Sequence, residues 1–173
     1  MIPGELLAGP YPVRGHTDDM DHVLVALLDA GIRSIIDLME EEEIDNHEEG
    51  ELYPHYEDRM ETLAQERSTI VEIQRHPIVA AAPPPLQELE LIVDAVDNEM
   101  EGRNSPTLVH CSDGNGRTGL IVGCYLARHG LANGQEVLDK IRDLRAFDAE
   151  LAEQKSPDNI VQERIVTRWK EGQ

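Results

Sequence analysis

The residues with the clearest capacity for chemistry lie in one stretch, Pro106 to Leu120, where Cys111 and Arg117 are separated by five residues. The apolar, β-favouring run 107–109 precedes this spacer, which contains two glycines, and an apolar helical pattern follows it. A strand, a tight loop and a helix N-terminus together form an anion site. The loop N–H groups and the positive end of the helix dipole face the same space.

Cys111 is the candidate nucleophile of this anion site. Loop N–H groups and a nearby arginine favour the thiolate, which is the reactive form of cysteine. The five-residue spacer places this soft nucleophile and the guanidinium of Arg117 on opposite sides of one bound phosphate. The alternative, a buried structural cysteine before a helix, would need no arginine at this spacing.

The stretch His110 to Gly119 resembles the phosphate loop of cysteine-dependent protein phosphatases of the tyrosine and dual-specificity kinds. The His-Cys pair, the two glycines and Arg-Thr-Gly all fall in register. The resemblance covers nearly the whole chain, because 4–12 and 36–38 are similar to the opening strands of bacterial dual-specificity-like phosphatases and 123–130 to their helix after the loop. It implies hydrolysis of a phosphate monoester through a phosphocysteine on Cys111, with no cofactor and no metal.

The resemblance also implies a role for each loop residue. The phosphate is expected to bind Arg117 and the backbone N–H groups of Ser112, Asp113, Gly114, Asn115, Gly116 and Arg117. Thr118 is placed to donate its hydroxyl to the Cys111 sulfur, and His110 is expected to orient the start of the loop. Gln162, in the last helix, either positions the hydrolytic water or is an ordinary exposed helix residue.

The general acid is missing where the resemblance places it. In this family an aspartate in a Pro-Ile-x-Asp context protonates the leaving oxygen, and the matching segment here, 77–80, ends in Ala80. General acid catalysis contributes about 10²–10⁴-fold. Three explanations stay open: an engineered substrate-trapping variant, an acid elsewhere in the chain, or a pseudophosphatase that mainly binds phosphorylated ligands.

Asp113 is the first candidate for a replacement acid. Its Cys-Ser-Asp-Gly context partly resembles the loops of myotubularin-type phosphatases, whose second aspartate is Gly116 here. Alternatively, Asp113 stabilises the loop and faces solvent or an arginine; Asp148 and Glu72 are weaker candidates for the acid. A loop carboxylate and the absence of loop lysines disfavour highly charged inositol phosphates. The expected partner is therefore a phosphorylated protein or a small aryl phosphate.

Composition excludes several other classes of function. The chain has 173 residues and a formal net charge of −20, which argues against nucleic acid and acidic membrane surfaces as partners. No apolar run approaches the roughly 20 residues of a membrane span, and the N-terminus does not read as a signal peptide.

Only two cysteines are present, Cys111 and Cys124, so a reducing cytoplasm is expected. Cys124 is expected to be packed in the core, with a redox partnership to Cys111 as the alternative. The histidines lack the i, i+4 spacing of a zinc pair.

The elements needed to position the loop follow from hydrophobic periodicity. Strands alternate with helices, which predicts one α/β domain over residues 1–173 with a central, mainly parallel sheet of about four to five strands flanked by helices. The resemblance makes this a protein tyrosine phosphatase-like fold. The expected strands are 4–12, 32–38, 69–73 and 107–109, and the expected helices are 18–30, 56–67, 86–100, 117–128, 135–144 and 158–170. Thr17 can cap the first of these helices, and Leu86 and Ile160 are expected to face inward on the third and the last. The acidic run 40–50 is expected to be a solvated loop.

Overall fold

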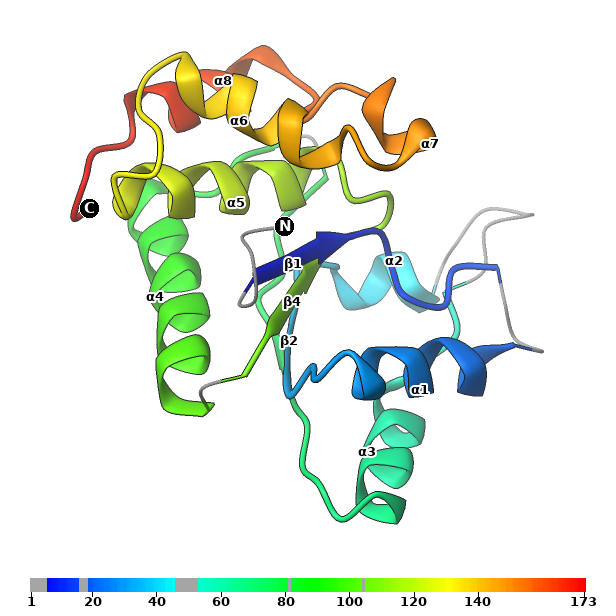
Figure 1. The fold of residues 1–173 in the computed structure, drawn as a ribbon. Coiled ribbons are helices and arrows are strands. Elements are labelled where there is room, and N and C mark those ends of the chain that lie inside the picture. Colours follow the sequence, from blue (N-terminus) through cyan, green and yellow to red (C-terminus); the bar gives the residue numbers. More distant parts are fainter. Residues whose placement is uncertain (1–5, 16–18, 46–52, 81, 104) are drawn as a thin grey trace.

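A four-stranded parallel sheet forms the centre of the molecule, in the order β1-β4-β2-β3; Figure 1 labels its first three strands, β1, β4 and β2. The computed structural model describes residues 6–15, 19–45, 53–80, 82–103 and 105–173. The strands are β1 (Leu6–Gly9), β2 (Ser34–Asp37), β3 (Glu72–Arg75) and β4 (Thr107–His110). Every residue of β2 and β4 is buried, as expected for strands in the middle of a parallel sheet. The predicted α/β class and parallel sheet are thus confirmed.

Helices cover both faces of this sheet. They are α1 (Met20–Asp29), α2 (Glu41–Asp45), α3 (Glu57–Glu66), α4 (Leu86–Arg103), α5 (Gly116–Arg128), α6 (Glu136–Arg145), α7 (Ala149–Ala152) and α8 (Ile160–Arg168). Helices α4 and α5 pack against the sheet, with α6 and α8 on α5, while α1 and α3 lie together on the other side (Figure 1). No helix in the described ranges is long and apolar enough to cross a membrane.

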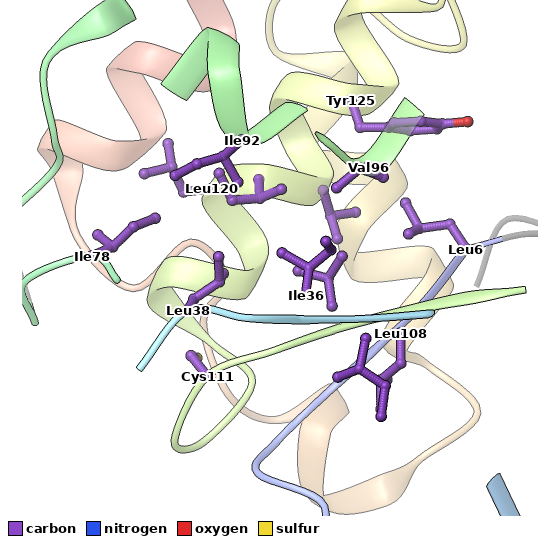
Figure 2. Packing of buried hydrophobic residues seen from close by; sticks show 14 of the residues in the cluster. Leu6, Ile36, Leu38, Ile78, Ile92, Val96, Leu108, Cys111, Leu120 and Tyr125 are labelled. Carbon is purple, nitrogen blue, oxygen red and sulfur yellow. The ribbon is translucent and has the colours of Figure 1, made fainter. Parts of the chain in front are cut away.

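The core lies mainly between the sheet and helices α4 and α5. Ile36 and Leu38 point from the sheet toward Leu120 and Ile92, and Leu108 points to the opposite face (Figure 2). This alternation follows from the strand period of two residues. Strand β4 pairs in parallel with β1 and β2, so its C-terminal end delivers Cys111 to the edge where β1 and β2 also end.

Three local expectations differ from the structure. The run 40–43 is not simply a solvated loop, because Glu41–Asp45 form the short helix α2, anchored by the buried Ile44. The third strand begins at Glu72 rather than Thr69, since the N–H of Thr69 still bonds the carbonyl of Ala64 at the end of α3. Helix α7 was not predicted, which reflects its length of four residues.

Two further expectations concern exposure and capping. Leu86 and Ile160 were expected to face inward, but they are 51% and 54% exposed. Both are the first residues of their helices, α4 and α8. The proposed cap at Thr17 lies outside the described residues, and α1 begins after Asp19, whose side chain makes no capping hydrogen bond.

Candidate active site

The phosphate loop connects the buried end of β4 to the N-terminus of α5. Gly114 is required at its tip, because φ is +74° and a Cβ there would lie 2.6 Å from the backbone carbon of Gly9. The carbonyl of Ser112 accepts a hydrogen bond of 3.1 Å from the N–H of Tyr11, so the chain after β1 braces the loop. The loop is therefore held against the sheet edge by backbone contacts that leave no space for a side chain at its tip.

Cys111 lies at the base of this loop and is 1% exposed. The hydroxyl of Thr118, in the first turn of α5, donates to its Sγ at 3.1 Å. A hydroxyl that donates to the sulfur is placed to stabilise negative charge on it when the thiolate departs. The contact follows from the seven-residue separation across the loop, which brings the first helical turn back over the sulfur.

Arg117 is nearly buried, with 5% exposure, and its guanidinium is fixed by protein acceptors. Glu43 of α2 accepts from Nη1 at 2.5 Å and from Nη2 at 3.0 Å, a bidentate pair. Nη1 also donates to the carbonyls of Leu38 at 3.4 Å and Ile78 at 3.1 Å. Burial disfavours the cation, but the hydrogen bond to Glu43 and the surrounding negative charge raise the pKa of Arg117, so it stays charged.

Glu43 is the principal site residue that the sequence did not reveal. Its acidic run resembles any solvated surface segment, and it lies 74 positions from Arg117. One signal was available: the run follows β2 directly, and the ends of parallel strands meet at one edge of the sheet.

The carboxylate of Asp113 lies beside Cys111 and is hydrogen-bonded within its own loop. One carboxylate oxygen, Oδ1, lies 3.7 Å from the Cys111 sulfur and accepts from the backbone N–H of Asn115 at 3.1 Å. The other, Oδ2, accepts from the Asn115 amide at 3.0 Å. The carboxylate is thus anchored by its own loop and placed beside the nucleophile.

A second brace reaches the loop from α6 and the chain after α7. Arg145 donates to the carbonyl of Gly114 at 2.9 Å and to the side-chain oxygen of Asn115. The Asn115 amide also donates to Gln154 at 2.5 Å. Burial lowers the pKa of Arg145 from its ordinary value, although the field of Asp113 opposes that shift. Neither Arg145 nor Gln154 was predicted, because nothing in their local sequence marks contact with a loop some 30 to 39 residues away.

His110, the last residue of β4, is fully buried beneath the loop. Its Nε2 lies 2.7 Å from the hydroxyl of Tyr56, which burial holds in the neutral form by raising its pKa. Burial also lowers the pKa of His110, so the imidazole is neutral near pH 7. The nearby Asp37 carboxylate is engaged by the N–H of Met39 at 2.8 Å and by Arg75 at 3.0 Å.

The remaining predicted positions are distributed around this centre. Ala80 is exposed in the loop that follows Ile78, whose carbonyl contacts Arg117. Gln162 is 1% exposed on α8, so it is not an exposed helix residue. Its side-chain oxygen is buried without a hydrogen-bond partner in the described part of the chain. Glu72 begins β3, at the edge of the sheet opposite the site, which removes it as a candidate acid.

Two other expectations concern Cys124 and metals. Cys124 is a free thiol with no exposure in the middle of α5, and burial raises its pKa well above the ordinary value. The prediction that Cys124 is packed in the core is therefore confirmed. Within the described ranges, no group of three or more His, Cys, Asp or Glu side chains is arranged to hold a metal ion. His16 and His47 lie outside those ranges.

Comparisons with known proteins identify the family of the chain. A model of the PTP-SAK family, described as a Swiss Army Knife protein, DSP-PTPase phosphatase domain, matches residues 2–161. The chain belongs to this family. The class predicted from the loop, cysteine-dependent phosphatases of the dual-specificity or tyrosine-phosphatase-like kind, is therefore confirmed.

Individual relatives of this PTP-SAK domain are distant. The chain is 26% identical over 130 residues to a probable phosphatidylinositol 3,4,5-trisphosphate 3-phosphatase, TEP1, of Saccharomyces cerevisiae; the match covers 63% of the chain and only 30% of the yeast protein. The Tk-PTP structure in its G95A form superimposes with a TM-score of 0.64 at 18% identity, over 96% of this chain and 92% of that one. PTPMT1 in complex with PI(5)P gives a TM-score of 0.62 at 20% identity, over 95% and 89%. At these identities the two structures show a shared fold.

Proposed function

We propose that the domain hydrolyses phosphate monoesters through a phosphocysteine on Cys111. The observation that carries this proposal is the contact of Thr118 with the Cys111 sulfur at the base of a loop whose arginine is held in place. In the first step the thiolate attacks phosphorus and the bond to the leaving oxygen breaks. In the second step water attacks the phosphocysteine, and the thiolate departs toward the Thr118 hydroxyl.

Arg117 binds the equatorial oxygens of the phosphoryl group together with the N–H groups of residues 112–117. Its pair with Glu43 supports this role, because a guanidinium held before substrate arrives needs no reorganisation as charge spreads in the transition state. His110 orients the start of the loop through Tyr56. Gln162 contributes from α8 by positioning the hydrolytic water.

Asp113 is the proton carrier in this proposal, since Ala80 cannot donate a proton. The Cys111 thiol transfers its proton to the Asp113 carboxylate, 3.7 Å away, leaving a thiolate and a carboxylic acid. That acid protonates the leaving oxygen as its bond to phosphorus breaks. In the second step the carboxylate accepts the proton of the attacking water. Ala80 stands at the general-acid position whether it is natural or was introduced to trap substrate.

The surroundings of the site favour substrates of low charge. Glu43 and Asp113 lie beside Arg117 and Cys111, and the phosphate loop contains no lysine. A phosphotyrosine protein or a small aryl phosphate meets less repulsion there than a multiply phosphorylated inositol ring. The relative TEP1 is named for a trisphosphate lipid, and PTPMT1 was solved with a monophosphate lipid. On the grounds of site charge, we propose that this chain instead prefers a phosphorylated protein or a small aryl phosphate. A catalytic thiol also suits the reducing cytoplasm.

The second candidate function is a phospho-ligand binding module on the same fold, and the observation that favours it is Ala80. A phosphatase hydrolyses the phosphate ester that it binds, whereas a binding module does not. Aryl phosphates with leaving groups of graded pKa separate them when tested on the chain and on the variants Ala80→Asp, Asp113→Asn and Cys111→Ser. Ala82→Asp is the matched control, because Ala82 is exposed in the same loop two positions on.

An enzyme that lacks an efficient acid should hydrolyse good leaving groups and lose rate steeply as the leaving group becomes more basic. Ala80→Asp should then gain about 10²–10⁴-fold on the poorest leaving groups, and Ala82→Asp should gain little. Asp113→Asn should lose rate mainly on poor leaving groups, because they depend most on protonation of the leaving oxygen; an equal loss on all substrates would remove Asp113 as the general acid. Full activity of Cys111→Ser would refute the nucleophile. Binding of phosphotyrosine peptide without any turnover would establish the binding module instead.

A further inference from the structure

A cavity of about 210 Å³ lies beside the phosphate loop, outside the phosphate cradle. Its walls come from β1, α5, α6 and the segment 147–156. Gly114 and Thr118 contribute to the lining, whereas Cys111, Asp113 and Arg117 are absent from it among the described residues. The cavity therefore touches the outer side of the loop, and neither the proposed nucleophile nor the phosphate clamp opens into it.

The lining of this cavity is mainly apolar. The larger apolar residues of the lining are Leu7, Val122, Ile141, Leu144, Phe147 and Leu151. The polar side chains that reach the wall already have partners: Thr118 donates to the Cys111 sulfur, Ser156 to the carbonyl of Asn115 at 2.9 Å, and Arg145 to the carbonyl of Gly114. Water needs two to four polar partners to be held in such a space, so this cavity favours an apolar occupant.

The volume of the cavity and the exposed ring of Phe147 indicate which class of small molecule would bind there. An apolar cavity of about 150 Å³ accepts benzene, so 210 Å³ has room for a fused two-ring molecule. Phe147, the single phenylalanine of the chain, lines the cavity but is 74% exposed. A ring at this position offers an aromatic ligand an edge or a face to pack against.

We propose that this cavity is a binding site for a small, neutral aromatic molecule, separate from the phosphate cradle. The ligand packs against Val122 and Ile141 and contacts the outer side of Gly114 and Thr118. Arg145 lines the cavity and also donates to the carbonyl of Gly114, so a bound ligand lies beside this support of the loop without entering the phosphate cradle. Binding does not depend on the proposed function.

Indole is a suitable probe, and titration calorimetry of the full chain measures its binding directly. We expect saturable 1:1 binding with a negative heat-capacity change, the mark of buried apolar surface. Val122→Phe and Leu144→Phe each fill the cavity and should weaken indole binding at least tenfold. Leu91→Phe is the matched control, since Leu91 is 64% exposed on α4 and does not line the cavity; its affinity should stay within twofold.

Two further measurements separate this site from the catalytic one. Saturating inorganic phosphate should leave the indole affinity within twofold, and Cys111→Ser should bind indole as the parent chain does. The proposal is overturned if phosphate displaces indole, if both filled variants bind as well as the parent, or if no saturable binding occurs. Binding by Phe147→Ala alone would also overturn it, because Phe147 itself would then occupy the cavity of the parent chain.

Discussion

Removing the charge of Glu43 should destabilise the protein and lower kcat, because the guanidinium of Arg117 loses the bidentate pair that orients it. Arg117 is 5% exposed, and besides Glu43 its hydrogen-bond acceptors in the described part of the chain are neutral: the carbonyls of Leu38 and Ile78 and the Met39 sulfur. In Glu43→Gln the cation remains buried without its counter-ion. Breaking a buried pair by removing one partner costs about 3–5 kcal/mol. Glu43 is 27% exposed, so water recovers part of the loss and we expect about 2–3 kcal/mol.

Urea unfolding of Glu43→Gln measures this cost, and inorganic phosphate provides a second readout. A phosphate bound at Arg117 replaces the missing negative charge, so the stability gap between the variant and the parent should narrow at saturating phosphate. Glu42→Gln is the matched control, because Glu42 is the exposed preceding residue of α2 and should change stability by less than about 0.5 kcal/mol. A Glu43→Gln protein as stable as Glu42→Gln, with unchanged kcat, would refute the buried pair.

Two further predictions concern the supports of the site. Burial lowers the pKa of His110 in the folded state, so the unfolded chain binds more protons below about pH 6.5. Stability should therefore fall as pH drops through that value, and urea midpoints of His110→Gln should depend less on pH between 5 and 8 than those of the parent. In Gly123→Ala the new methyl group would lie 2.6 Å from Val166 and push α8 from α5, at a cost of about 1–3 kcal/mol. Gly102→Ala in α4 has open space and should be neutral or slightly stabilising in the same denaturation assay; equal effects would contradict the packing argument.

The sequence determined the phosphate loop, because its parts are contiguous. Cys111, the glycines and Arg117 lie within one strand–loop–helix unit, and Gly114 at φ +74° is a local requirement of the backbone. The parallel sheet was likewise predicted, from strands that alternate with helices along the chain. These features depend on residues that are close together in the sequence, so the composition and the periodicity of the sequence predict them.

Tertiary structure alone decided which distant groups support that loop. Glu43 and Arg145 look like ordinary surface charges in the sequence, since a charge pattern does not say whether its partner is water or a buried ion. Glu43 reaches Arg117 because β2 and β4 are adjacent and end at the same edge, and Arg145 reaches Gly114 because α6 packs on α5. Such contacts arise from chain crossings of 30 or more residues, which no local pattern records.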